Sequence, residues 1–156
     1  MALEIERKYL IDHKKWSRID KPAGKLYRQG YLLTDKNKTI RVRITDSDAY
    51  LTIKGKTHGA ARDEFEYKIP LTDASQLLDT FSESELSKTR YEIHDKNNLW
   101  EVDVFHDANE GLIVAEIELK SQDQEFDLPD WVTQEVTNDP KYYNSNLTLF
   151  PFKKWS

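Results

Sequence analysis

Apolar and polar residues alternate with a period of two along most of this chain. That period is typical of β-strands, whose successive side chains point to opposite faces of a sheet. The predicted strands cover residues 2–11, 26–33, 38–45, 49–55, 62–69, 87–94, 98–105 and 112–120. Turn-rich pieces such as Asp35-Lys36-Asn37-Lys38 separate them. The pattern therefore predicts a mainly β protein with eight strands.

Three segments favour helices over strands. Residues 12–19 and 73–84 are the two longer candidates, and Thr72 and Asp73 supply a cap and a first-turn acid for the second. A short helix is predicted near 140–150, after Asn138-Asp139-Pro140. The predicted class is thus mainly β (α+β), with a few helices packed outside the strands.

The polar faces of seven predicted strands carry mostly ionisable residues. They are Glu4, Glu6 and Lys8; Arg41 and Arg43; Lys54; Arg62, Glu64, Glu66 and Lys68; Lys88 and Arg90; Glu101 and Asp103; and Glu116, Glu118 and Lys120. Any one of these faces could be the solvated side of an antiparallel sheet. Together they favour a closed eight-stranded antiparallel barrel, because closure removes exposed edges and brings the charged faces into one lumen. The apolar faces would then point outward, under the helices and loops.

A lumen lined by acids and bases is costly to desolvate unless its charges pair or bind ions. Carboxylates on neighbouring strands are hard oxygen ligands that suit Mg²⁺ or Mn²⁺, whereas Zn²⁺ would require His or Cys. Arginine and lysine in the same lumen suit phosphate groups. Metal together with phosphate is the simplest joint interpretation.

Composition limits the remaining possibilities. The 156 residues fit a single domain, 1–156, and 12% aromatic content argues against disorder. A net charge of -5 disfavours a nucleic-acid partner. The absence of cysteine, the charged first residues and the lack of a membrane-length apolar run predict a cytoplasmic protein with no membrane partner. The sequence leaves a homodimer open.

The segment Glu4-Ile5-Glu6-Arg7-Lys8 resembles the N-terminal Glu-x-Glu-x-Lys strand of the triphosphate tunnel metalloenzymes. The domain that these enzymes share, the CYTH domain, is named for class IV adenylate cyclase and thiamine triphosphatase. The other charged pairs follow in the family's order: Arg41-x-Arg43, Lys54, Arg62-x-Glu64-x-Glu66, Lys88-x-Arg90, Glu101-x-Asp103 and Glu116-x-Glu118. The stretch from Trp131 to Leu147 is similar to the tail of the short bacterial members, so the resemblance covers nearly the whole chain.

The resemblance implies a barrel whose tunnel holds a triphosphate and one or two divalent cations, Mg²⁺ or Mn²⁺, with a helix near the tunnel mouth. It implies metal ligands at Glu4, Glu6, Glu116 and Glu118, with Asp103, Glu64 and Glu66 contributing. It implies a triphosphate clamp of Lys8, Arg41, Arg43, Lys54, Lys88 and Arg90. Arg62 and Glu101 fit either this site or a neighbouring ion pair.

The implied activity is hydrolysis of inorganic triphosphate (tripolyphosphate) to diphosphate and phosphate, with Glu4, Glu6 and Lys8 as the catalytic residues. Short length favours this activity, because little chain remains to build a base-recognition pocket; a class IV adenylate cyclase and a thiamine or nucleoside triphosphatase stay as alternatives. The acidic positions on four strands argue against a non-catalytic polyphosphate binder. Lys8 is either a base that activates water, with Tyr31 near it, or a phosphate contact only. For Trp131, Tyr142 and Tyr143 we expect plain packing.

Overall fold

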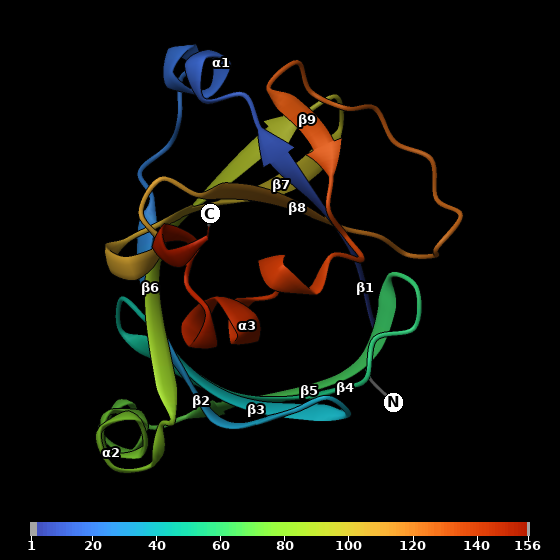
Figure 1. Cartoon of the computed structure of the whole chain (residues 1–156). Helices are drawn as coiled ribbons and strands as arrows, with labels where there is room; N and C mark the ends of the chain where they lie inside the picture. Colours follow the sequence, from blue (N-terminus) through green and yellow to red (C-terminus); the bar gives the residue numbers. More distant parts are fainter. Residues whose placement is uncertain (1–2, 156) are drawn as a thin grey trace.

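The strands of the computed structural model, which describes residues 3–155, form a closed ring in Figure 1. They are β1 (Leu3–Ile11), β2 (Lys25–Asp35), β3 (Lys38–Thr45), β4 (Asp48–Gly55), β5 (Ala61–Ile69), β6 (Ser84–Asp95), β7 (Asn98–Phe105), β8 (Ile113–Glu118) and β9 (Val132–Glu135). Eight of them close in the order β5-β4-β3-β2-β6-β7-β8-β1, and β1 returns to β5. Neighbouring strands run antiparallel throughout, which confirms the predicted eight-stranded barrel.

The first strand closes the barrel because different parts of it pair with different neighbours. Its residues 6–10 pair with β8, whereas residues 3–5 pair with the start of β5. On the edge of β1 that faces away from β8, Tyr9 and Ile11 pair with β9. This ninth strand was not predicted, because Val132–Glu135 is too short for an alternating pattern to be recognised.

The helices lie close to their predicted positions. The first, α1 (His13–Arg18), begins where the Asp12 carboxylate accepts the Lys15 N–H. The second, α2 (Leu71–Phe81), starts earlier than predicted, directly after Pro70, and stops before β6 begins. The last, α3 (Asn144–Leu149), follows a 3₁₀ turn (Pro140–Tyr142) and lies within the ring of strands in Figure 1, whereas α1 and α2 lie outside it.

Apolar side chains cover the outside of the barrel, as the alternating pattern predicts. One cluster centres on Trp16, Trp100 and Trp131, whose rings meet edge to face. Another seats α2 on β3 and β4 through Val42 and Leu78. Burial of these outer faces leaves the charged faces turned inward.

One end of the lumen is apolar rather than charged. Leu86, Phe105, Val114 and Leu147 form a buried cluster there, and Leu147 of α3 is fully buried. The strand positions in this cluster share the inward parity of Lys88, Asp103 and Glu116. The third helix thus packs into the barrel and partly closes the end where β2 turns into β3.

Candidate active site: a charged cavity inside the barrel

A cavity of about 220 Å³ occupies the middle of the barrel. It is lined by Glu4, Glu6, Lys8, Tyr31, Thr39, Arg41, Arg43, Lys54, Arg62, Glu64, Glu66, Lys88, Arg90, Glu101, Glu116, Glu118, Tyr143, Asn144 and Ser145. Every residue predicted for the site is among them except Asp103. Lys68, although it has the same strand parity, is exposed and pairs with Asp48.

The charges are sorted around the wall by strand. The neighbouring strands β1, β8 and β7 carry most of the carboxylates, whereas β6, β3 and β4 carry mainly cations. The strand between β6 and β3, β2, contributes the neutral Tyr31, and β5 carries both signs. A polyanion and its counter-cations could therefore bind side by side in the one cavity.

Carboxylates on the acidic wall face each other directly. Glu6 is paired in register with Glu118 across β1 and β8, and Glu101 with Glu116 across β7 and β8. Like charges opposite each other destabilise a sheet unless a cation lies between them. Burial, together with the charges of Glu116 and Glu4, raises the pKa of Glu6 to about 8. This donor set fits a divalent cation with oxygen ligands.

The carboxylates do not converge on one point in this structure. Within residues 3–155, no three Asp, Glu or His side chains lie close enough together to hold a metal ion. They contact basic groups instead: the Lys54 ammonium lies 3.0 Å from a Glu4 oxygen and 3.6 Å from one of Glu64. An incoming anion would compete with these carboxylates for Lys54, and an incoming cation would compete with Lys54 for the carboxylates.

Lys8 lies among carboxylates. Its Nζ is 3.7 Å from Glu116 Oε1 and 3.9 Å from Glu6 Oε1, and it lies over the ring of Tyr143. Burial alone would lower the pKa of Lys8, but the charges of Glu116 and Glu6 outweigh it and raise that pKa. Without a metal on these carboxylates, this environment favours the charged form of Lys8, as a phosphate contact requires.

Asp103 lies behind the cavity wall. Its side chain is 1% exposed, and its oxygens accept from Lys88 Nζ at 2.7 Å and from Arg90 Nε and Nη2 at 2.7 and 2.8 Å. Burial alone would raise the pKa of Asp103, yet Arg90 and Lys88 hold it well below its usual value. Both oxygens are thus engaged by Lys88 and Arg90, and the metal role of Asp103 stays a prediction.

Three arginines of the basic wall have unpartnered donors. The Nε atoms of Arg41, Arg43 and Arg62 are buried without a hydrogen-bond partner. Burial, with the neighbouring Arg41 and Arg90 charges, lowers the pKa of Arg43 to about 10. Unsatisfied buried donors on charged groups are costly. The Glu66 carboxylate neutralises only part of this charge, since it lies 3.5 Å from Arg43 and 3.6 Å from Arg41. The wall is therefore arranged to receive an anion.

Several residues of the site were not predicted from the sequence. Tyr27 lies beneath the guanidinium groups of Arg43 and Arg90, 5.0 and 5.2 Å from its ring centre. Asn144 of α3 accepts a hydrogen bond from Lys88 Nζ at 3.0 Å. Tyr143, expected only to pack, lines the cavity. The even spacing of Tyr27 and Tyr31 on β2 was the one available signal, whereas nothing local indicates that Asn144 enters the lumen.

The fold and this cavity define a closed antiparallel β-barrel protein with a charged internal cavity. Residues 2–149 match the CYTH domain, and the chain belongs to that family.

Two relatives are similar over their full lengths. An inorganic triphosphatase of Acetivibrio thermocellus is 43% identical over 156 residues, which cover 99% of each chain. An inorganic triphosphatase of Nitrosomonas europaea is 34% identical, covering 94% of this chain and 97% of the relative.

Two solved structures are also similar to this chain. The crystal structure of the inorganic triphosphatase NE1496 superposes with a TM-score of 0.65 at 31% identity, covering 96% of each chain. The PH1012 protein of Pyrococcus horikoshii, at 16% identity and a TM-score of 0.57, covers 76% of this chain and 80% of its own and shares the fold. No helix in residues 3–155 is long and apolar enough to cross a membrane.

Proposed function

We propose that this chain is an inorganic triphosphatase that hydrolyses tripolyphosphate to diphosphate and phosphate. The observation that carries the proposal is the set of buried, unpartnered guanidinium donors of Arg41, Arg43 and Arg62, which face paired carboxylates across one enclosed cavity. The two relatives, 43% and 34% identical and both named inorganic triphosphatase, support inorganic triphosphate as the substrate.

In this proposal the basic wall positions the substrate. Arg41, Arg43 and Arg62 donate to phosphate oxygens, and Lys88 and Arg90 are held toward the cavity by Asp103. Hydrolysis of a phosphoric anhydride depends mainly on neutralising the charge on the phosphoryl group and holding a water in line. Fixed cations meet the first requirement because they need little reorganisation when charge shifts to the leaving diphosphate.

The acidic wall is the proposed site of the cofactor. Glu4, Glu6, Glu116 and Glu118 would hold one or two Mg²⁺ or Mn²⁺ ions, with Glu64 and Glu66 beside them, whereas Asp103 is already occupied. When bound, the cation supplies charge neutralisation at phosphate oxygens and lowers the pKa of a coordinated water. Lys8 joins the two walls and contributes a phosphate contact rather than a base.

The test is a substrate panel. We expect the purified chain to release phosphate from tripolyphosphate with Mg²⁺ or Mn²⁺, faster than from ATP or thiamine triphosphate, and to form no cyclic AMP. Preference for ATP with cyclic AMP as product would replace the proposal with a class IV cyclase. Full activity in chelator without added metal would refute the cofactor. Cytoplasmic location and a homodimer stay predictions.

A further inference from the structure

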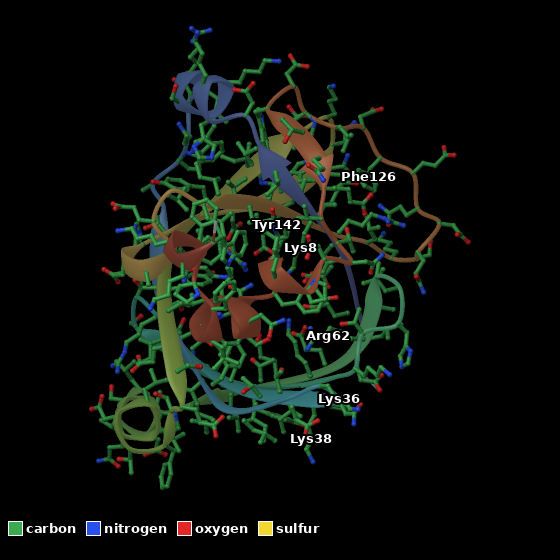
Figure 2. All side chains as sticks on the ribbon, viewed as in Figure 1. Lys8, Lys36, Lys38, Arg62, Phe126 and Tyr142 are labelled. Atoms are coloured by element: carbon green, nitrogen blue, oxygen red, sulfur yellow. The ribbon has the colours of Figure 1, made fainter. Side chains whose placement is uncertain are left out.

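The first strand changes neighbours at Lys8, along the edge of β1 that faces away from β8. On this edge residues 3–5 pair with β5, and the Glu6 N–H donates to the Ala60 carbonyl at 3.1 Å. Further along, Tyr9 and Ile11 pair with β9. Lys8 lies at the junction, which we call the seam, and Figure 2 shows Lys8 within the ring of strands.

A side chain rather than a strand accepts the Lys8 N–H at the seam. The acceptor is the Thr137 hydroxyl oxygen, at 3.1 Å, while the Lys8 carbonyl accepts the Val136 N–H at 2.8 Å. Thr137 lies two residues beyond the end of β9 and is buried. A buried N–H without a partner is costly. The position of the β1 backbone at Lys8 therefore depends on this hydroxyl.

The direction of the Thr137 hydroxyl is set by its own acceptor. Thr137 donates to Oε2 of Glu135, and the Arg7 guanidinium lies 2.9 Å from the same oxygen. An ionised carboxylate only accepts hydrogen bonds, so the hydroxyl proton is directed to Glu135 and a lone pair is left for the Lys8 N–H. Because Arg7 precedes Lys8 on β1, the contacts Arg7–Glu135–Thr137 return to the strand that carries Lys8. We call these contacts the relay.

A small pocket at the seam lies between the relay and the active-site side chains. It measures about 20 Å³ and is lined by Glu6, Lys8, Thr57, Gly59, Ala60, Arg62, Thr137 and Tyr143. A pocket of this volume has room for about one water molecule. Glu6 and Lys8 line the central cavity as well. Thr137 therefore borders the same small space as two residues of the active site.

We propose that Thr137 is a positioning residue for hydrolysis, which with Glu135 and Arg7 fixes the β1 backbone at Lys8 and so places the Lys8 ammonium group. This inference rests on the proposed function of the cavity. The ammonium lies 3.7 Å from Glu116 and 3.9 Å from Glu6, and a backbone shift at the seam would change both distances. Misplacing a substrate-contacting group by about 1 Å can lower a rate by about 10²-fold.

The first test compares three substitutions. Thr137→Val replaces the hydroxyl by a methyl group and removes the acceptor, whereas Thr137→Ser keeps the hydroxyl. The control, Thr133→Val, makes the same change at an exposed position of β9. We expect Thr137→Val to lower kcat/KM for tripolyphosphate by about tenfold or more. Thr137→Ser should restore most of that loss, and Thr133→Val should match wild type.

A mutant cycle with Lys8 separates positioning from a merely structural role. We expect Thr137→Val to lower kcat/KM little further in a Lys8→Met background, because its effect passes through Lys8; a general structural defect would lower both backgrounds equally. Hydrogen exchange tests the contact independently of activity. The Lys8 amide should exchange about tenfold faster in Thr137→Val, while the β1 amides bonded to β8 keep their protection.

Wild-type kcat/KM in Thr137→Val, or an equal loss in Thr137→Ser, would overturn the role of the hydroxyl. A full further loss in the Lys8→Met background would overturn its action through Lys8. Should wild type fail to hydrolyse tripolyphosphate, the proposed function fails, and exchange of the Lys8 amide still tests whether Thr137 fixes the β1 backbone.

Discussion

The buried carboxylate of Asp103 gives the sharpest test of how the clamp is held. We predict that Asp103→Asn destabilises the metal-free protein strongly, because the substitution leaves Lys88 and Arg90 without their shared counter-charge. Both cations are almost fully buried, with side chains 1% and 9% exposed. Arg90 keeps Glu101 and Glu116, whereas Lys88 keeps, within residues 3–155, one hydrogen-bond partner, the Asn144 amide oxygen, and the ring faces of Tyr27 and Phe105.

The magnitude follows from burial. Removing one partner of a buried ion pair costs about 3–5 kcal/mol, because a buried charge is left uncompensated. The matched control is Glu101→Gln on the same strand, which also contacts Arg90 but whose side chain is 32% exposed. For that exposed partner we expect a loss of about 1 kcal/mol or less.

The assay is denaturant unfolding in chelator, so that no metal contributes. Two results together would refute this role of Asp103. The unfolding free energy of Asp103→Asn would lie within about 1 kcal/mol of wild type, the range of an exposed pair, and Mg²⁺ would no longer stabilise the variant. That outcome would restore Asp103 as a metal ligand.

The same residue predicts a pH dependence. The pKa of Asp103 is lowered on folding from its ordinary 3.8, so its stabilising contribution is complete above that value and is lost as pH falls below it. We therefore expect the difference in unfolding free energy between wild type and Asp103→Asn to shrink as the pH falls below about 4. A difference that is unchanged down to pH 2.5, as measured by unfolding at several pH values with chelator present, would contradict this assignment.

Three further predictions concern other parts of the barrel. Lys8→Arg should keep most of its kcat for tripolyphosphate, because the charge and not proton transfer is required; a loss of about 10²-fold or more would indicate a general base. Glu6→Gln/Glu118→Gln should reduce the rise in unfolding midpoint that saturating Mg²⁺ gives wild type, and an undiminished rise would place the metal elsewhere. Leu147→Ala should cost about 2–5 kcal/mol in unfolding free energy, since this side chain is fully buried between α3 and the strands; a neutral result in denaturant titration would argue against α3 closing the lumen.

The barrel could be predicted from the sequence because its signal is local and repeated. Alternation of charged and apolar residues, as in Glu4 to Tyr9, fixes both the strand and its inward face. Closure then brings distant strands together, which is why the cavity contains nearly every predicted residue. The short β9 carries too few residues to produce such a pattern.

The roles of individual residues could not be predicted in the same way, because parity gives the face but not the depth. Asp103 and Glu116 both lie at inward-facing positions of neighbouring strands, yet only Glu116 lines the cavity. Asp103 lies behind the cavity wall, paired with Lys88 and Arg90. Asn144 enters the lumen through the packing of Leu147 on the barrel, a tertiary contact with no local sequence pattern. The hydrogen bonds of Asp103 with Lys88 and Arg90, and that of Asn144 with Lys88, both come from three-dimensional packing.

The barrel cavity itself, through its basic wall, is proposed to hydrolyse tripolyphosphate. The most direct measurement is ³¹P NMR of tripolyphosphate with Mg²⁺, followed with wild type and with Arg41→Met/Arg43→Met at matched folded concentration. We predict that wild type produces diphosphate and phosphate in equal amounts and that the variant, lacking two of the buried guanidinium groups, is slower by about 10²-fold or more. Equal rates for the two proteins, or no product with wild type, would contradict it.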